Sequence, residues 1–496
     1  MKKFENLMSF NKDTVALNKI ADRLSWDQAT MMPKGAVIDR IEEFAAIEKV
    51  IHSRQSSNEL GDLLDDIQQD KLNRHQKRQF YLISRAFART RKVPQELAVA
   101  LARLKPKSKA VWRQARYDDD FTSFKPLLSQ MIALRQEEGR ALAKEKFFSP
   151  YDALLTEYEP SSSTSDIKHM FDALREPFVE LRAEVLEQKK PEPFSGVFDT
   201  EKQMILSQEL ALIFGYDLNR GRIDKAVHPF SSGSSSDVRI STRTIDKDPM
   251  NCFYSTIHET GHACYEQNIN PDYAFTAYGK GTSLAIHESQ SRIYENQLGR
   301  SRGFTAYLFR RMLQIFGDFG VKDEESFYRL VNRVSQGYIR TEADELQYNL
   351  HVMLRFDLER ALISGDLMTD DLETAWNDRF MADFGYAIDR PSNGVLQDVH
   401  WSEGTFGYFP TYTIGNVYAG CLFETLENAV PNLQNDLAKG NVSVATDWLK
   451  KSVHQHGSAY EAKELMTIAC GAEPTVKPLI SYITAKFSDI YGFKQT

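Results

Sequence analysis

Residues that break helices are scarce in this chain. Glycine occupies 26 and proline 17 of the 496 positions, both below their usual shares of about 7% and 5%. Hydrophobic residues make up 42% and charged residues 26% of the sequence, an ordinary balance for a globular protein. Because so few breakers favour helices over a loop-rich β fold, we expect a mostly α-helical protein.

The N-terminal part predicts successive amphipathic helices over residues 12–145. Breaks between them are expected at Met32-Pro33-Lys34-Gly35, at Val93-Pro94 and at Lys105-Pro106, because proline disfavours a continuing helix. A serine-rich loop at 159–165 separates a helical part, 1–160, from a catalytic part, 161–496, within what we expect to be one catalytic unit, 1–496.

Charge and cysteine content exclude several classes of protein. The net charge is −8, which gives no support for nucleic-acid binding. Basic residues concentrate between Arg74 and Arg116, with Glu96 as the single acid; this stretch is either a solvated helical face or a positive wall that attracts anions. The four cysteines are too few and too scattered for a disulfide framework. Without a secretory signal or a long apolar run, we expect a cytoplasmic protein with no membrane partner.

One segment departs from the helical pattern. In Asp237–Thr244, Val238, Ile240 and Thr242 alternate with polar residues, which predicts a short β-strand after a loop rich in serine and glycine.

The strongest chemical motif follows this strand. His258-Glu259-Thr260-Gly261-His262 is an H-E-x-x-H sequence, with Asp248 and Pro249 upstream as a helix start. Histidines four apart lie on one helix face and can bind one cation, while the glutamate reaches a water on that cation. We predict His258 and His262 as metal ligands and Glu259 as the general base.

A catalytic zinc usually has three protein ligands, so one is missing from this motif. A second helical segment offers His287-Glu288, and adjacent helical residues point about 100° apart, so only one of them can face the metal. We favour Glu288, because two histidines and a glutamate form a known catalytic zinc set. The alternatives are His287 as the ligand, or Glu288 in a surface pair with Arg292.

Other short blocks accompany this motif: Ser25-Trp26-Asp27-Gln28, His228-Pro229-Phe230, Asp237-x-Arg239, His287-Glu288-Ser289-Gln290, Ile339-Arg340-x-x-Ala343-Asp344 and Gly394-x-x-Gln397-Asp398-x-His400-Trp401. In this order, together with the H-E-x-x-H sequence, they resemble the signature blocks of the carboxypeptidase Taq family of zinc-dependent carboxypeptidases. The family has threonine where this chain has Ser241; because the hydroxyl is retained, we expect little consequence.

The resemblance implies a large helical fold cut by a deep substrate groove, similar to neurolysin and angiotensin-converting enzyme, and a homodimer. It also implies that Arg340 binds the terminal carboxylate of the substrate, a task that suits the planar guanidinium. The alternative for Arg340 is a structural ion pair with Glu342, Asp344 or another buried acid. Arg239 is a second candidate for substrate binding, since it can point from the predicted strand into the groove.

His400, Tyr408 and Tyr412 are candidates to bind the substrate or to stabilise the oxyanion, because histidine and tyrosine donors do so in other enzymes with two histidines and one glutamate at the metal. We assign His400 and Tyr412 to catalysis and Tyr408 to substrate binding. Each has the alternative of a packed side chain.

These observations together predict a metallocarboxypeptidase that removes single C-terminal residues from peptides with broad specificity. Glu259 would take a proton from a water polarised by the metal and return it to the leaving amine. The metal is one divalent ion per chain, Zn²⁺ in the first place, with Co²⁺ or Mn²⁺ also suited to these ligands. The alternatives are a neurolysin-type endopeptidase or dipeptidyl carboxypeptidase, and a non-catalytic helical peptide-binding protein.

Overall fold

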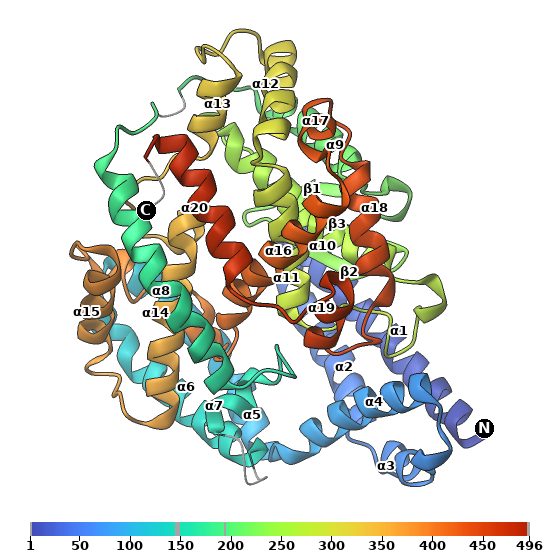
Figure 1. The fold of residues 1–496 in the computed structure, drawn as a ribbon. Helices are drawn as coiled ribbons and strands as arrows, with labels where there is room; N and C mark the ends of the chain where they lie inside the picture. The colour runs from blue at the N-terminus through green and yellow to red at the C-terminus, as the bar shows by residue number, and fades with distance from the viewer. Residues whose placement is uncertain (1, 144–148, 193–194, 494–496) are drawn as a thin grey trace. The chain divides into compact units, whose positions relative to one another are not determined.

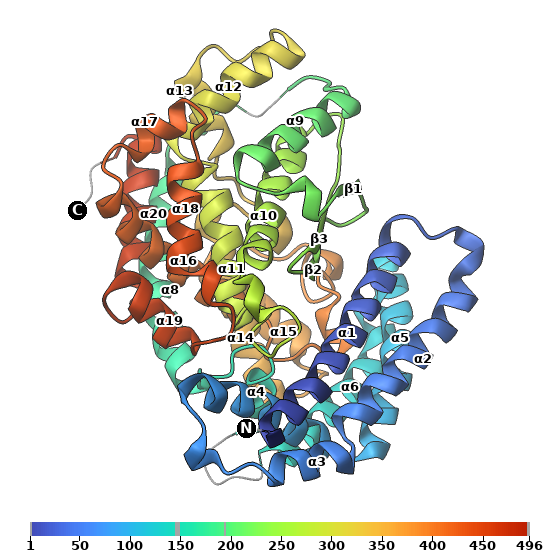
Figure 2. The same ribbon diagram turned by 90° about the vertical axis from the view of Figure 1, so that its right-hand side faces the viewer.

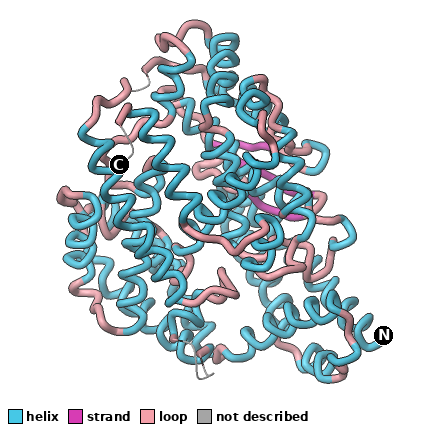
Figure 3. The backbone as a smooth tube through the Cα atoms, in the orientation of Figure 1, coloured by secondary structure: helices cyan, strands magenta, loops and turns pink. Residues whose placement is uncertain are grey.

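The computed structural model describes residues 2–143, 149–192 and 195–493. About 70% of the chain is helical, and the strands of the described residues form one small sheet (Figure 3). The prediction of a mostly α-helical fold with a short hairpin is therefore confirmed. The four cysteines are free thiols, as their number and spacing predicted.

Contacts along the chain define two compact units, each assembled from three stretches. Unit 1 contains residues 1–91, 192–331 and 418–474, and unit 2 contains 92–191, 332–417 and 475–496. The sequence analysis divided the chain once, after residue 160, and that functional division stays a prediction.

Unit 1 contains the H-E-x-x-H motif and the three strands of the described residues (Figure 1). Its helices and strands are α1 (Lys2–Thr30), α2 (Val37–Gln55), α3 (Asn58–Asp65), α4 (Arg74–Lys92), α9 (Thr200–Ile213), β1 (Ile223–Lys225), β2 (Ser231–Ser234), β3 (Asp237–Thr242), α10 (Pro249–Asn268), α11 (Leu284–Arg292), the π-helical turn η5 (Ile293–Leu298), α12 (Arg302–Phe316), α13 (Glu324–Val331), α17 (Leu433–Ala438), α18 (Ser443–Ser452) and α19 (Ala462–Cys470).

The described residues of unit 2 contain helices, turns and loops but no strand. Its main elements are α5 (Gln95–Asp118), α6 (Phe121–Leu142), α7 (Pro150–Leu155), α8 (Thr164–Glu187), the 3₁₀ turn η6 (Arg340–Glu342), α14 (Glu345–Ser364), α15 (Leu372–Phe384), the 3₁₀ turn η8 (His400–Glu403), α16 (Pro410–Ala429, whose last residues belong to unit 1) and α20 (Lys477–Tyr491).

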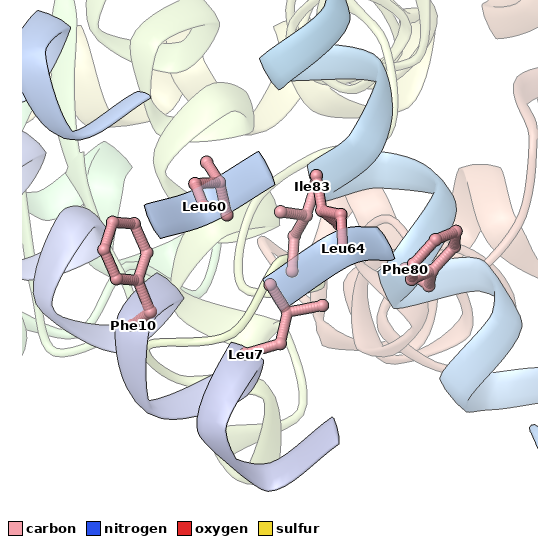
Figure 4. Packing of buried hydrophobic residues seen from close by; sticks show 6 residues of the cluster. All are labelled: Leu7, Phe10, Leu60, Leu64, Phe80 and Ile83. Carbon is pink, nitrogen blue, oxygen red and sulfur yellow. The ribbon is translucent and has the colours of Figure 1, made fainter. Parts of the chain in front are cut away.

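The N-terminal end of unit 1 has its own small core, where α1, α3 and α4 meet (Figure 4). Apolar side chains from the three helices point toward one another there and are at least 92% buried. Burial of this kind stabilises by about 1.5–3 kcal/mol for each large side chain, so it fixes how these helices pack. The cluster consists of Leu7, Phe10, Leu60, Leu64, Phe80 and Ile83.

The helix that contains the H-E-x-x-H motif begins where the sequence predicts. The Asp248 carboxylate accepts a hydrogen bond from the Asn251 backbone N–H at 3.2 Å, and Pro249 is the first helical residue. This cap satisfies a backbone donor that the helix itself leaves free. The helix ends at Asn268, shortly before Pro271.

The small sheet packs on this helix (Figure 2). Its central strand β3 pairs in parallel with β1 and antiparallel with β2. Val238, Ile240 and Thr242 of β3 are fully buried, as the alternating pattern predicted. The hairpin of β2 and β3 is thus anchored to α10 by the buried face of β3.

Helix α5 corrects one of the predicted breaks. It continues through Pro106, where Lys105-Pro106 predicted an end. A proline inside a helix costs about 3 kcal/mol, but α5 packs along α6 and buries several large side chains. Each such side chain contributes about 1.5–3 kcal/mol, so their burial outweighs the missing hydrogen bond. They are Leu97, Leu101, Leu104 and Trp112.

Helices α10 and α11 approach each other most closely at Gly261, inside the metal-binding motif. A Cβ atom at this position would lie 2.5 Å from the Gln290 carbonyl oxygen and 2.6 Å from the Ser291 Cα. Both atoms belong to the α11 backbone, so no rotamer change can relieve the clash. The glycine therefore sets the distance between the helix of the two histidines and the helix of Glu288.

Gly261→Ala should force these helices apart and lower the free energy of unfolding by about 1–3 kcal/mol, the usual cost of overpacking. Gly35→Ala is the matched control, because nothing lies within 4 Å of a Cβ built at Gly35; it should change stability by less than about 0.5 kcal/mol. Urea unfolding of both variants decides the matter, and equal midpoints would contradict the close contact.

Candidate metal centre and arginine cluster

Two helices of unit 1 bring three possible metal ligands to one place. His258 and His262 lie one turn apart on α10, and Glu288 lies on α11. The Nε2 atoms of the histidines are 3.8 Å and 3.4 Å from Glu288 Oε2. Their ligand atoms all lie within 4.8 Å of one another, a spacing that one cation can span.

Glu288 does pair with Arg292, but the pair is largely buried rather than on the surface. Glu288 Oε1 accepts a hydrogen bond from Arg292 Nε at 2.6 Å, while Oε2 faces the two histidines. His287 lies on the other side of His262, with the two Nδ1 atoms 2.6 Å apart. This arrangement supports Glu288 rather than His287 as the third ligand.

The Nδ1 nitrogens of His258 and His262 also have hydrogen-bond partners. His258 Nδ1 lies 2.9 Å from Glu295 Oε2, in the π-helical turn that continues α11. His262 Nδ1 meets His287, and His287 Nε2 in turn lies 3.1 Å from Glu266 Oε1. Because both Nδ1 atoms have partners, both Nε2 atoms are directed toward Glu288. Partners of this kind orient the ligands in known metal sites.

Burial and neighbouring charges shift the pKa values of this cluster. Burial raises the pKa of Glu288, but Arg292 and the histidines outweigh it and hold the pKa well below its usual range. Burial lowers the pKa of His262 to about 4, which keeps the imidazole neutral and able to bind a metal. Burial raises the pKa of Glu259 to about 7, with Glu288 adding to the shift and His258 opposing it.

The donor set fits a divalent metal of the zinc type. Two neutral imidazoles and one carboxylate are the ligands of known catalytic zinc sites. Three glutamates lie around two arginines here, because Arg292 and Arg300 pair with Glu288 and Glu295 while Glu259 is buried beside them. A divalent cation would compensate this negative charge.

Arg239 lies in a pocket of unit 1 that is lined by α1, the β2–β3 hairpin and Phe275. Its guanidinium donates two hydrogen bonds to Asp237, at 2.7 and 3.0 Å. Arg23 also contacts Asp237, at 3.0 Å. Asp237 thus links the hairpin to α1, while Arg239 borders an accessible pocket beside Trp26.

Ser241, which stands in place of the family threonine, uses its hydroxyl. The Oγ accepts a hydrogen bond from the Phe230 backbone N–H at 3.0 Å. The Phe230 ring packs against Trp26 with ring centroids 5.0 Å apart. Three of the blocks quoted above therefore contact one another through these residues, and His228 beside them is exposed.

Unit 2 contains a buried cluster of two arginines around one carboxylate. Arg340 Nη2 lies 2.7 Å from Asp398 Oδ1, and Arg355 Nε lies 2.6 Å from Asp398 Oδ2. Burial raises the pKa of Asp398, but the two guanidiniums hold it well below its usual range. Burial lowers the pKa of Arg355 to about 10, still above neutrality. The three groups therefore have one surplus positive charge.

The ion pair considered as an alternative for Arg340 exists, with Asp398 rather than with Glu342 or Asp344. Arg340 Nη1 also donates to the Tyr348 hydroxyl at 3.0 Å. The guanidinium lies 5.1 Å from the Tyr412 ring centroid, as in cation–π contacts. Because the cluster has one surplus positive charge, the ion pair with Asp398 is compatible with binding of a substrate carboxylate by Arg340.

His400 and the two candidate tyrosines lie in the same part of unit 2. The His400 ring stacks on Tyr408 with centroids 5.5 Å apart, and Tyr408 meets Tyr412 edge-on at 5.3 Å. His400 Nδ1 is 3.7 Å from Asp398, beyond hydrogen-bond distance. Burial lowers the pKa of His400 to about 4, so a neutral ring with one N–H faces this cluster.

A buried glutamate on α14 fixes the loop that follows His400. Glu359 accepts hydrogen bonds from Trp401 Nε1 at 2.9 Å, from the Tyr151 hydroxyl at 2.8 Å and from the Gly407 backbone N–H at 2.9 Å. Burial raises its pKa to about 7, although these donors oppose the shift. The loop between His400 and Tyr408 is thereby attached to α14.

Sequence reasoning missed four residues: Glu266 and Glu295 beside the candidate metal ligands, and, in unit 2, Arg355 beside Asp398 and Glu359 beside Trp401. Two of them have a signal in the sequence, because Glu266 follows His262 by one helical turn and Glu295 follows Glu288 by two turns. Arg355 and Glu359 have none, since their partners are remote in the chain.

Comparison with known proteins agrees with this arrangement. The family model of the carboxypeptidase Taq (M32) metallopeptidases matches residues 6–487. The chain belongs to the carboxypeptidase Taq family. The resemblance noted in the sequence is thus confirmed, and the protein is an enzyme of the metal-dependent carboxypeptidase class.

Two relatives illustrate the extent of the match within the carboxypeptidase Taq family. Thermostable carboxypeptidase 1 of Thermus thermophilus is 35% identical over 510 aligned positions, which cover 99% of each chain. Carboxypeptidase 1 of Bacillus subtilis is 33% identical over 94% of each chain.

Solved structures of this family have the same fold. The M32 carboxypeptidase of Deinococcus radiodurans has a TM-score of 0.95 and 33% identity, over 99% of this chain and 100% of that one. Metallocarboxypeptidase 1 of Trypanosoma cruzi has a TM-score of 0.95 and 31% identity, over 98% of this chain and 99% of that one.

Membership in the carboxypeptidase Taq family implies a divalent metal and peptide substrates. Among the helices of the described residues, none combines the length and the hydropathy needed to cross a membrane.

Asp398→Asn should leave two buried guanidiniums without a carboxylate and lower the free energy of unfolding by about 3–5 kcal/mol at neutral pH. Because the folded-state pKa is depressed, this contribution is present above the unfolded value of 3.8 and is lost as the pH falls below it. Unfolding measured between pH 3 and 7 tests this, with Asp378→Asn, an exposed residue of α15, as the control. Equal losses in both variants would contradict a shared buried carboxylate.

Proposed function

We propose that this protein removes single C-terminal residues from peptides with broad side-chain tolerance. The observation that supports it best is the convergence of His258, His262 and Glu288 beside the buried Glu259. Two imidazoles, a carboxylate and an adjacent glutamate are the groups that metal-assisted hydrolysis of a peptide bond requires.

In this proposal His258, His262 and Glu288 bind one divalent cation. A cation bound there would polarise the scissile carbonyl and make water more acidic. Zn²⁺ is our first choice, and Co²⁺ or Mn²⁺ suit the same ligands.

Glu259 is proposed as the general base. Its carboxylate takes a proton from the attacking water and delivers it to the nitrogen of the leaving residue, so one group serves both half-steps. A pKa raised to about 7 by burial suits a group that must accept and release a proton near neutrality.

Arg340 is proposed to bind the terminal carboxylate of the substrate. The surplus positive charge that Arg340 and Arg355 share around Asp398 supports this role, because a buried cation without a full complement of anions favours a negatively charged ligand. Recognition of the free carboxylate would restrict cleavage to the last peptide bond.

The remaining candidates are proposed to complete the site. The neutral His400 and the hydroxyl of Tyr412 would donate hydrogen bonds to the oxyanion, and Tyr408 and Arg239 would contact the substrate. The homodimer, the cytoplasmic location and the substrate groove stay predictions drawn from the sequence.

A neurolysin-type endopeptidase or dipeptidyl carboxypeptidase is the second candidate function, since it would use the same metal ligands. The surplus charge near Arg340 favours a carboxypeptidase over an endopeptidase, because an endopeptidase has no terminal carboxylate to bind. A dipeptidyl carboxypeptidase would differ in releasing two residues at a time.

Glu259→Gln should abolish peptide hydrolysis and keep the bound metal, because the three ligands remain. We expect a loss in kcat of about 10²–10⁴-fold or more. His258→Ala is the matched variant, since it should lose metal and activity together. Metal content after dialysis and hydrolysis rates are measured for both, and an active Glu259→Gln enzyme would contradict the general base.

Amidation of the peptide terminus should lower kcat/KM by about 10- to 100-fold, since charge-assisted hydrogen bonds contribute roughly 1.5–3 kcal/mol. Arg340→Lys should reduce hydrolysis of the free acid more than of the amide, because ammonium loses the planar fork. Arg390→Lys, at an exposed arginine of unit 2, should behave as wild type. Rates on matched peptides, with products identified by mass spectrometry, test this, and equal rates on acid and amide would favour the endopeptidase.

A further inference from the structure

The two candidate histidine ligands are held in different ways. His258 Nδ1 meets a carboxylate directly, at 2.9 Å from Glu295. His262 Nδ1 instead meets a second imidazole, at 2.6 Å from His287 Nδ1, and a carboxylate contacts the far nitrogen of that imidazole. That carboxylate is Glu266, whose Oε1 lies 3.1 Å from His287 Nε2.

The direction of the hydrogen bonds in this chain follows from its last member. A carboxylate only accepts hydrogen bonds, so His287 Nε2–H donates to Glu266. When His287 carries a single proton, that proton is the one on Nε2, so its Nδ1 accepts. His262 must therefore donate its Nδ1–H to His287, which leaves His262 Nε2 without a proton and with its lone pair toward Glu288.

We propose that Glu266 is a positioning residue that sets, through His287, the tautomer and orientation in which His262 Nε2 binds the metal. The inference rests on the proposed function, because it takes His258, His262 and Glu288 as the ligands. It gives His287 a role that differs from that of a ligand.

Glu266 is itself held in position for this role. It lies on α10 one turn after His262 and is 6% exposed. Its Oε1 also accepts a hydrogen bond from the Gly281 backbone N–H at 3.1 Å. Its Oε2 is buried and has no hydrogen-bond partner among the described residues. The charges of Lys19 and Lys280 attract the carboxylate from nearby.

His287 is fixed from two further sides. It precedes Glu288 at the start of α11, where the Ser283 hydroxyl caps the helix by accepting from the Ile286 N–H at 3.2 Å. Its ring packs against Tyr265 with centroids 5.2 Å apart. The start of α11 thus supplies one ligand and the residue that orients another.

The test is zinc affinity of the metal-free protein, measured by competition with a chelator of known affinity. Glu266→Leu and His287→Leu should each weaken zinc binding by about 10- to 100-fold, the usual effect of losing such a partner. The double variant should bind zinc no more than about threefold less tightly than the single variant with the lower affinity. Both substitutions break the same series of hydrogen bonds, so their effects should not add. The loss of zinc affinity in Glu295→Leu should multiply with the loss in Glu266→Leu, because Glu295 contacts His258 and not His262 or His287.

Two variants separate this role from a general effect on α10. Glu266→Gln keeps a hydrogen-bond acceptor and should restore most of the affinity that Glu266→Leu loses. Gln267→Leu alters the adjacent buried residue, which contacts Asp217 and Arg220 but neither histidine, and should leave zinc affinity within about threefold of wild type. Imidazole ¹⁵N shifts of the metal-free protein should show the proton of His262 on Nδ1, and should show a mixture of tautomers in Glu266→Leu.

Zinc affinity within twofold of wild type in Glu266→Leu, or multiplicative effects of Glu266→Leu and His287→Leu, would overturn the inference. A glutamine variant no better than the leucine variant, or a wild-type His262 with its proton on Nε2, would do the same. His258→Ala is measured alongside and must lose tight zinc binding. If His258→Ala still binds zinc tightly, the ligand set of the proposed function is wrong. If His258→Ala loses tight zinc binding while Glu266→Leu keeps the wild-type affinity, only the positioning role is wrong.

Discussion

The close contact of α10 with α11 at Gly261 is the constraint on which the candidate metal centre depends. The two histidines and Glu288 come from different helices, and their distances follow from how near the two backbones lie. The same contact brings His287 against His262 and Glu295 against His258. One position without a side chain therefore determines the geometry of both the ligands and the groups that orient them.

The candidate metal centre of unit 1 and the arginine cluster of unit 2 differ in the sign of their charge. The histidines lie among three glutamates, Glu259, Glu288 and Glu295, and Arg292 and Arg300 pair with the last two. Around Asp398, two guanidiniums share one carboxylate. The first site is thus suited to a cation and the second to an anion, which are the two kinds of charge that a metal and a peptide terminus provide.

The sequence predicted the parts of this structure that depend on local pattern. Few breakers predicted the helices, alternation predicted β3, and Asp248 with Pro249 predicted the start of α10. Angular spacing on a helix predicted that only one of His287 and Glu288 faces the metal, and the known set of two histidines and a glutamate led us to favour Glu288. The partners of Arg340 did not follow, because Asp398 lies 58 residues away and is also held by Arg355, so only the packed structure brings them together. Pro106 was misjudged because the local cost of a proline is visible in the sequence, whereas the burial along α6 that offsets it is not.

The interleaving of the chain has a consequence for how the protein reaches its native state. Unit 1 is completed only by residues 418–474, and hydrogen bonds such as those of His454 to Gln290 and of Arg78 to Ser458 join segments 164 and 380 residues apart. Synthesis proceeds at about 5–20 residues per second, so the nascent helix of the H-E-x-x-H motif waits on the order of ten seconds or more for the segment that closes its own unit. During that interval buried faces of α10 and α11 are exposed to chaperones and to other chains, and long-range contacts of this kind also slow refolding.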